Sequence, residues 1–176
     1  MAGHEPDLPW SVRLLRRVGG LLLAIPRRWG FVPALLWAGL IFFGSSRPVP
    51  PIGVGGAVGA VAANFAHALE YGVFAVCLAL SAPRRAGWVE LPPRAVSAIL
   101  LLVLFYASSD EWHQSFTPHR DASVFDVITD VAGASATLAC IAAVGARDRA
   151  GRKLLVRFAV GFLACVAAAA LATWGG

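Results

Sequence analysis

The segment YASSDEWHQSFTPHRDASVFDVITDVAG, residues 106–133, carries five acids, two histidines and one arginine between two long apolar runs. An ionisable group inside or beside hydrocarbon costs several kcal/mol, so a cluster of such groups is by default a functional site. The segment therefore predicts a polar site within a bundle of apolar helices.

The composition predicts an integral membrane protein of the all-α class. Hydrophobic residues make up 58% of the 176 residues and charged residues 14%, whereas about a quarter of a soluble domain is charged. Mean hydropathy is +0.69. The basic residues, 15 against 10 acids, lie mainly in the connections between apolar runs, where they set topology and contact lipid headgroups. We therefore expect membrane lipids as partners and no nucleic acid.

Apolar runs separated by Pro, Gly and Arg predict about five transmembrane helices. The expected spans are 29–44, 60–81, 95–114, 124–146 and 155–174. Ser123, with Asp126 three residues later, predicts the N-cap and acidic first turn of the fourth span. The Pro- and Gly-rich piece 48–59 is expected to be a loop.

Three segments are expected along the chain. Residues 1–28 predict a basic amphipathic helix lying at the membrane interface, with Trp10, Leu14 and Val18 on one side and arginines including Arg16 on the other. Residues 29–146 form the main membrane domain. Residues 147–176 form a basic linker and the last span.

The distribution of Lys and Arg predicts the orientation. Alternate connections sum to thirteen and two basic residues, with the N-terminal segment on the richer side. Because basic loops stay in the cytoplasm, we expect the N-terminus inside and the polar segment on the extracytoplasmic side.

Given that topology, polar groups from four spans are expected to meet in the outer half of the membrane. Separations of three and four residues place polar side chains on one face of a helix. The groups are His67, Glu70 and Tyr71 on the second span, Asp110 and Gln114 on the third, and Asp126 and Asp130 on the fourth. Glu70 should face inward, either protonated or paired with His67, with Arg120 or with a bound cation. Arg120 is a candidate for a bidentate clamp on a carboxylate or for contact with an anionic substrate. The expected pocket residues are Ser45, Ser46, His67, Glu70, Tyr71, Asp110, Glu111, Gln114, Arg120, Asp126 and Asp130.

Recognised catalytic and metal motifs are absent from the sequence. Its acids and histidines include enough N and O ligands for a cation, but there is no HExxH and no known ligand spacing on any single helix. We therefore predict neither a metal nor another cofactor. There is no phosphate-cradling glycine loop and no GxSxG, so the sequence names no catalytic residue.

Three motifs of the sequence carry a family resemblance: FGSSRP (43–48), the pattern of Asn64, His67, Glu70 and Tyr71, and DEWHQSFTPHR (110–120). Together they resemble the VanZ-like family of small bacterial membrane proteins, over about residues 32–146. The chain departs from the family's usual pattern at three positions: Asn64, where the family often has a Lys shortly before the His of the second span; His119, where it often has Gly; and Asp130, near which it often has Asn. The resemblance implies a VanZ-like four-helix unit in the bacterial cytoplasmic membrane and a role at the cell envelope, since the founding member is linked to low-level teicoplanin resistance.

Three hypotheses follow. The first is an envelope protein that binds a lipid, a lipid-linked precursor or a glycopeptide-type amphiphilic antibiotic in an outward-facing polar pocket. The second is an enzyme that acts on a lipid-linked substrate by acid–base or metal-assisted chemistry with the same side chains. The third is a structural subunit of a membrane complex, whose polar groups only join helices.

Overall fold

The structure is a computed structural model that describes all residues except 1–7, 48–55, 119, 121, 147–149 and 176. Parts of the predicted N-terminal segment, of the 48–59 loop and of the basic linker therefore lie outside the described residues. The elements are α1 (Trp10–Leu22), η1 (Arg27–Trp29), α2 (Phe31–Ser45), α3 (Gly56–Ala79), β1 (Arg84–Arg85), β2 (Trp88–Val89), α4 (Pro93–Gln114), α5 (Val124–Gly145) and α6 (Ala150–Gly175).

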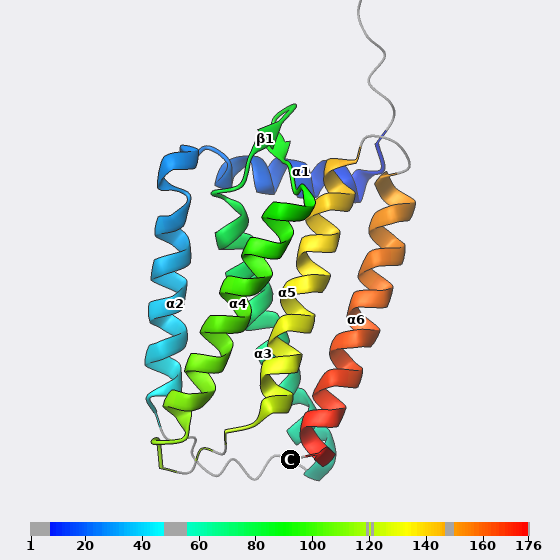
Figure 1. The fold of residues 1–176 in the computed structure, drawn as a ribbon. Helices are drawn as coiled ribbons and strands as arrows, with labels where there is room; N and C mark the ends of the chain where they lie inside the picture. The colour runs from blue at the N-terminus through cyan, green and yellow to red at the C-terminus, as the bar shows by residue number, and fades with distance from the viewer. Residues whose placement is uncertain (1–7, 48–55, 119, 121, 147–149, 176) are drawn as a thin grey trace, which may run out of the picture.

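The five predicted spans are confirmed as five helices that are long and apolar enough to cross a membrane. They run side by side, and α1 crosses one end of the bundle with the β1–β2 hairpin beside it (Figure 1). Two boundaries differ from expectation: α3 begins at Gly56 and α6 at Ala150. Helix α6 thus includes Arg152 and Lys153, which precede the predicted span. Arg157, within that span, donates from Nη1 to the carbonyl oxygen of Ala139 on α5 at 2.9 Å.

Helices α3 and α5 cross in backbone contact. A Cβ atom added at Gly133 would collide with the backbone carbonyl of Ala68, and one added at Gly72 would lie 2.8 Å from Oγ1 of Thr137. Each helix thus presents two small residues spaced by four, the pattern that lets helices in membranes approach closely. This crossing fixes the position of the neighbouring polar side chains.

Arginine side chains hold α1 to the end of the bundle. Arg16 donates from Nε and Nη2 to the carbonyl oxygen of Val144, at 3.1 and 2.9 Å, at the C-terminus of α5. Val12 is fully buried against Val144. We expected Arg16 to face the headgroups with the other arginines of α1; instead, it satisfies helix-end carbonyls that would otherwise lack a donor.

The hairpin between α3 and α4 was not predicted. Its turn residues Ala86 and Gly87 have φ values of 50° and 74°, as a two-residue hairpin turn requires. The ring of Trp88, which follows, contacts Gly19 of α1 and Gly145 of α5, and its Nε1 donates to the carbonyl oxygen of Ile141 at 3.0 Å. The hairpin therefore joins α1 to α5.

Candidate functional site

The polar segment folds as the last turns of α4, a short connection and the first turns of α5. Ser123 is the N-cap of α5, as predicted, because its Oγ accepts from the backbone N–H of Phe125 at 3.2 Å. This arrangement brings the C-terminus of α4 and the N-terminus of α5 to the end of the bundle opposite α1 (Figure 1). The acids of the two helices thereby lie near the N-terminal half of α3, which is at the same end of the bundle (Figure 1).

Four buried side-chain atoms from three helices have no hydrogen-bond partner within the described residues. They are Nδ1 of His67 and the hydroxyl of Tyr71 on α3, Oε1 of Glu111 on α4, and Oδ1 of Asp130 on α5. Tyr71 is fully buried, and Asp130 and Glu111 are 1% and 6% exposed. We call these four residues the polar cluster. Since nearly all buried polar groups in proteins are satisfied, such a concentration calls for an explanation.

Within the polar cluster, three residues are close enough to share one ligand. One potential ligand atom from each of His67, Glu111 and Asp130 lies within 4.8 Å of the other two. Nδ1 of His67 is 3.7 Å from Oδ1 of Asp130, which is too long for a hydrogen bond. Glu111 is oriented from outside the cluster, because its Oε2 accepts from the backbone N–H of Ser123 at 2.8 Å. Its second oxygen is the unpartnered one.

Three more of the expected residues form a separate network between α4 and α2. Gln114 donates from Nε2 to Oδ2 of Asp110 at 2.9 Å and approaches Oγ of Ser45 at 3.5 Å. All three side chains are buried. Thr117 extends the network by donating to the carbonyl oxygen of Ser45. These residues hold the end of α4 against the end of α2 and are internally satisfied.

Arg120 does not form the carboxylate clamp that we expected. Its Nε and Nη2 donate to the carbonyl oxygens of Arg47 and Gly44, at 3.3 and 3.1 Å. Among the described residues, no carboxylate lies within ion-pair distance of its guanidinium group. The end of α2 exposes carbonyl groups without helical partners, and a nearby guanidinium satisfies them.

Ser46 lies on the surface, away from the polar cluster. Its Oγ is 3.0 Å from Nε2 of His113, a separation that suits a serine nucleophile and its base. The hydroxyl, however, also lies 2.7 Å from the carbonyl oxygen of Phe42, which can only accept, so its proton points there. His113 in turn stacks on the ring of Phe42. The pair therefore caps the end of α2.

Glu70 and Asp126, the last expected residues, are half-buried. Glu70 lies three residues after His67 on α3, and Asp126 lies four residues before Asp130 on α5, so each is one helical turn from the polar cluster. Neither carboxylate has a hydrogen bond within the described part of the chain. Together with His67, which is 20% exposed, they form a more accessible polar border.

An apolar groove of about 480 Å³, which was not predicted, lies between α3, α5 and α6, and α1 closes one end of it. Its lining includes Leu22, Phe65, Gly72, Cys140 and Phe162. Ala68 and Gly133 form part of its wall, but no member of the polar cluster lines it. Only the three-dimensional crossing of α3 and α6 creates this groove, since its residues look like ordinary apolar spans.

Five helices of spanning length around a buried polar cluster define a multi-pass membrane protein. Residues 30–145 match the family model described as VanZ/LLP1, and because the match covers most of the chain, the protein belongs to this family. The resemblance of the motifs is thereby confirmed. No curated protein and no solved structure matches the chain.

Proposed function

We propose that this protein binds the polar headgroup of a membrane amphiphile at the polar cluster, from the extracytoplasmic side of the bacterial cytoplasmic membrane. The single observation that supports it is the set of four buried, unpartnered polar atoms contributed by α3, α4 and α5. Each such atom costs about 1–3 kcal/mol, so a ligand that satisfies them recovers free energy that the fold alone forgoes.

The border of the polar cluster supports access from the membrane. Glu70 and Asp126 are half-buried and His67 is partly exposed, so a polar group reaches the cluster past other polar groups. The hydrocarbon chains of an amphiphile would remain among lipid and apolar helix surfaces. A lipid, a lipid-linked envelope precursor and a lipoglycopeptide of the teicoplanin type all have this division into polar head and apolar chain.

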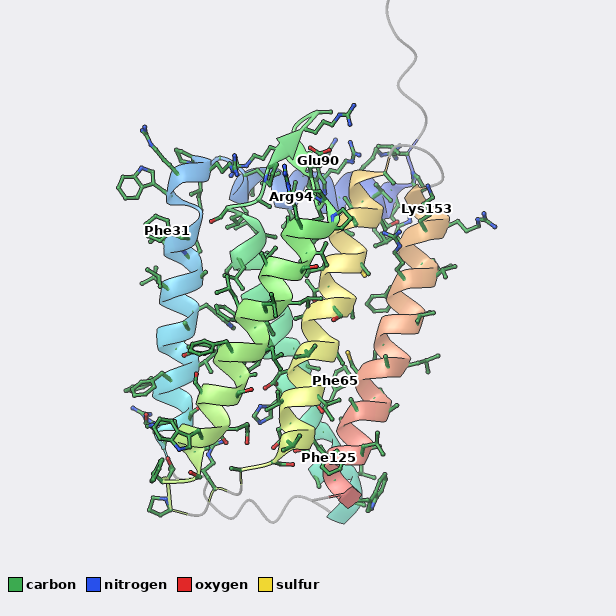
Figure 2. The ribbon with its side chains drawn as sticks, viewed as in Figure 1. Phe31, Phe65, Glu90, Arg94, Phe125 and Lys153 are labelled. Atoms are coloured by element: carbon green, nitrogen blue, oxygen red, sulfur yellow. The ribbon has the colours of Figure 1, made fainter. Side chains whose placement is uncertain are left out.

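Charge supports the proposed orientation. Arg94 and Lys153 lie at the α1 end of the bundle, whereas Phe125 lies towards the other end (Figure 2). The arginines of α1 and of the hairpin are at the same end, because those elements cross it (Figure 1). The positive-inside rule therefore supports the proposal that the α1 end is cytoplasmic and that the polar cluster lies in the outer half of the membrane.

The test is the lipid that the purified protein retains. We expect native mass spectrometry of the detergent-solubilised chain to show a bound amphiphile. Asp126→Asn or Tyr71→Phe should reduce its retention about tenfold or more, because a hydrogen bond to a charged group is worth about 1.5–3 kcal/mol. Glu90→Gln, in the exposed hairpin, is the control that should retain it fully. Equal retention by all variants would contradict the proposal.

One observation favours catalysis as a second candidate function. A histidine and two acids from three helices converge, which is the minimum for acid–base or metal-assisted chemistry on a lipid-linked substrate. Turnover of a lipid-linked envelope precursor by purified protein, abolished in His67→Gln, would establish it. Retention of that precursor without any product would leave binding as the function.

A further inference from the structure

We infer that His67, Glu111 and Asp130 bind one divalent metal ion of the zinc or manganese class. This goes beyond the proposed headgroup binding and does not depend on it. It also departs from the sequence-based prediction of no metal. Known metal-binding motifs have ligands close together along the chain, whereas these three residues lie on α3, α4 and α5.

The geometry fits a shared ion. Donor atoms about 2.0–2.2 Å from one ion are separated from each other by roughly 3–4 Å, depending on the coordination angle. The Nδ1–Oδ1 distance between His67 and Asp130 is 3.7 Å, within that range. The Glu111 ligand atom lies within 4.8 Å of both, so a small side-chain rotation completes the site. One imidazole and two carboxylates are donors that both zinc and manganese accept.

The unpartnered atoms are independent evidence for an ion. Each of the three residues has a buried atom without a hydrogen bond: Nδ1 in His67, Oε1 in Glu111 and Oδ1 in Asp130. The two carboxylates are more than nine-tenths buried. In a structural network such atoms would face donors, as Asp110 faces Gln114 nearby. Here, within the described residues, these atoms have no hydrogen-bond partner, and potential ligand atoms of the three residues lie within 4.8 Å of one another.

The charge of the site leads to the same conclusion. Two buried carboxyl groups within a membrane bundle remain ionised only if positive charge lies close by. Arg120, the expected counter-ion, donates to the carbonyl groups of α2 instead. Neither Lys nor Arg pairs with these acids in the portion of the chain that the structure describes. A divalent ion would neutralise both carboxylates and leave the imidazole neutral, the form that binds metal.

A supporting shell surrounds the three ligands. The backbone N–H of Ser123 holds Oε2 of Glu111 at 2.8 Å, which fixes the direction of Oε1. Such outer hydrogen bonds orient ligands in known metal sites. The unpartnered hydroxyl of Tyr71, one turn after His67, is available to a water or a headgroup oxygen bound to the ion. With three protein ligands, an ion here keeps positions open for such a group.

The experiment measures metal in the intact, detergent-solubilised protein. The chain is stripped with a chelator, dialysed separately against zinc, manganese, magnesium and calcium, and assayed by elemental mass spectrometry. We expect about one zinc or manganese ion per chain, and a loss of affinity of at least about tenfold in Glu111→Gln and Asp130→Asn. Glu90→Gln, an acid in the exposed hairpin, should bind like the original chain. Full occupancy in both cluster variants, or no ion in the original chain, would overturn the inference.

A second measurement needs no variant. The stripped original protein should gain thermal stability when zinc or manganese is returned, because an ion that binds only the folded state stabilises it. No gain with either ion would also count against the site. Bound lipid is measured in the same samples: lipid without metal defeats only this inference, and metal without lipid defeats only the headgroup proposal.

Discussion

The two ends of the bundle use their polar side chains in opposite ways. At the α1 end, arginines donate to carbonyl groups that lack helical partners: Arg84, for example, donates to the carbonyl oxygens of Leu23 and Ile25 at 2.6 and 2.7 Å. In the polar cluster, by contrast, the carboxylates of Glu111 and Asp130 each keep one buried oxygen without a partner. At the α1 end, charged side chains therefore join structural elements. In the polar cluster, the acidic side chains keep atoms that make no contact needed for folding.

The difference indicates which polar residues serve stability and which serve a ligand. Arg84 also has one unpartnered atom, Nε, but its other two nitrogens make three hydrogen bonds. Residues such as Asp110 and Gln114 resemble the α1 end, because they satisfy each other. Burial alone therefore does not separate the two roles. Asp110 and Glu111 are both buried and each accepts one hydrogen bond, but only Glu111 has a second buried oxygen without a partner.

The largest effect is expected where packing positions the polar cluster. Gly133→Val should destabilise the protein by about 3 kcal/mol or more, because any side chain there collides with the α3 backbone at Ala68. Unfolding in mixed detergent–SDS micelles would measure it. Gly39→Val is the matched control, since a Cβ at Gly39 meets nothing within 4 Å. Equal stability of the two variants would show that the α3–α5 crossing does not hold the cluster in place.

The next effect concerns the anchoring of α1. Arg16→Met should lower the free energy of unfolding by about 2 kcal/mol, because it removes hydrogen bonds from a charged donor to the end of α5. Arg17→Met removes an equal charge from an exposed position and should change stability by less than about 0.5 kcal/mol. The same unfolding assay compares them. If both variants had the same free energy of unfolding, the hydrogen bonds from Arg16 to the end of α5 would not contribute to stability.

A smaller effect is expected for the arginine of the central segment. Arg120→Met should cost about 1 kcal/mol, the usual worth of a hydrogen bond, because the end of α2 loses its donors. Retention of metal and of lipid should be unchanged, because Arg120 contacts none of the cluster. A loss of lipid without a loss of stability would show that Arg120 belongs to the binding site. Arginines would then serve a ligand at one end of the bundle and stability at the other.

Much of the fold was predictable because hydrophobic runs and their breakers are local signals. The five spans and the Ser123 cap follow from such signals. The contacts of Arg16 and the hairpin did not, since both depend on where the end of α5 lies in space. Helix α6 begins earlier than predicted because Arg152 and Lys153 interrupt the apolar run that predicted the span but are good helix formers.

The candidate site was predictable as a set of residues but not as an arrangement. Spacing on one helix suggested that His67 and Tyr71 share a face, and both have unpartnered atoms in the polar cluster. Spacing says nothing about pairing between helices, so it did not separate Glu111 and Asp130 from the self-satisfied Asp110. Residue spacing also did not predict that Arg120 donates to the end of α2, because the sequence does not show which helix-end carbonyl groups lie near a given arginine.

The most direct test compares the stability of two variants without metal or lipid. Asp130→Asn removes the charge of an unpartnered acid, whereas Asp110→Asn removes that of an acid bonded to Gln114. We predict that Asp130→Asn leaves the free energy of unfolding unchanged or raises it by up to about 2 kcal/mol, while Asp110→Asn lowers it by about 1 kcal/mol. A loss of 1 kcal/mol or more in Asp130→Asn would show that its carboxylate stabilises the fold, and would contradict the claim that the polar cluster exists for a ligand.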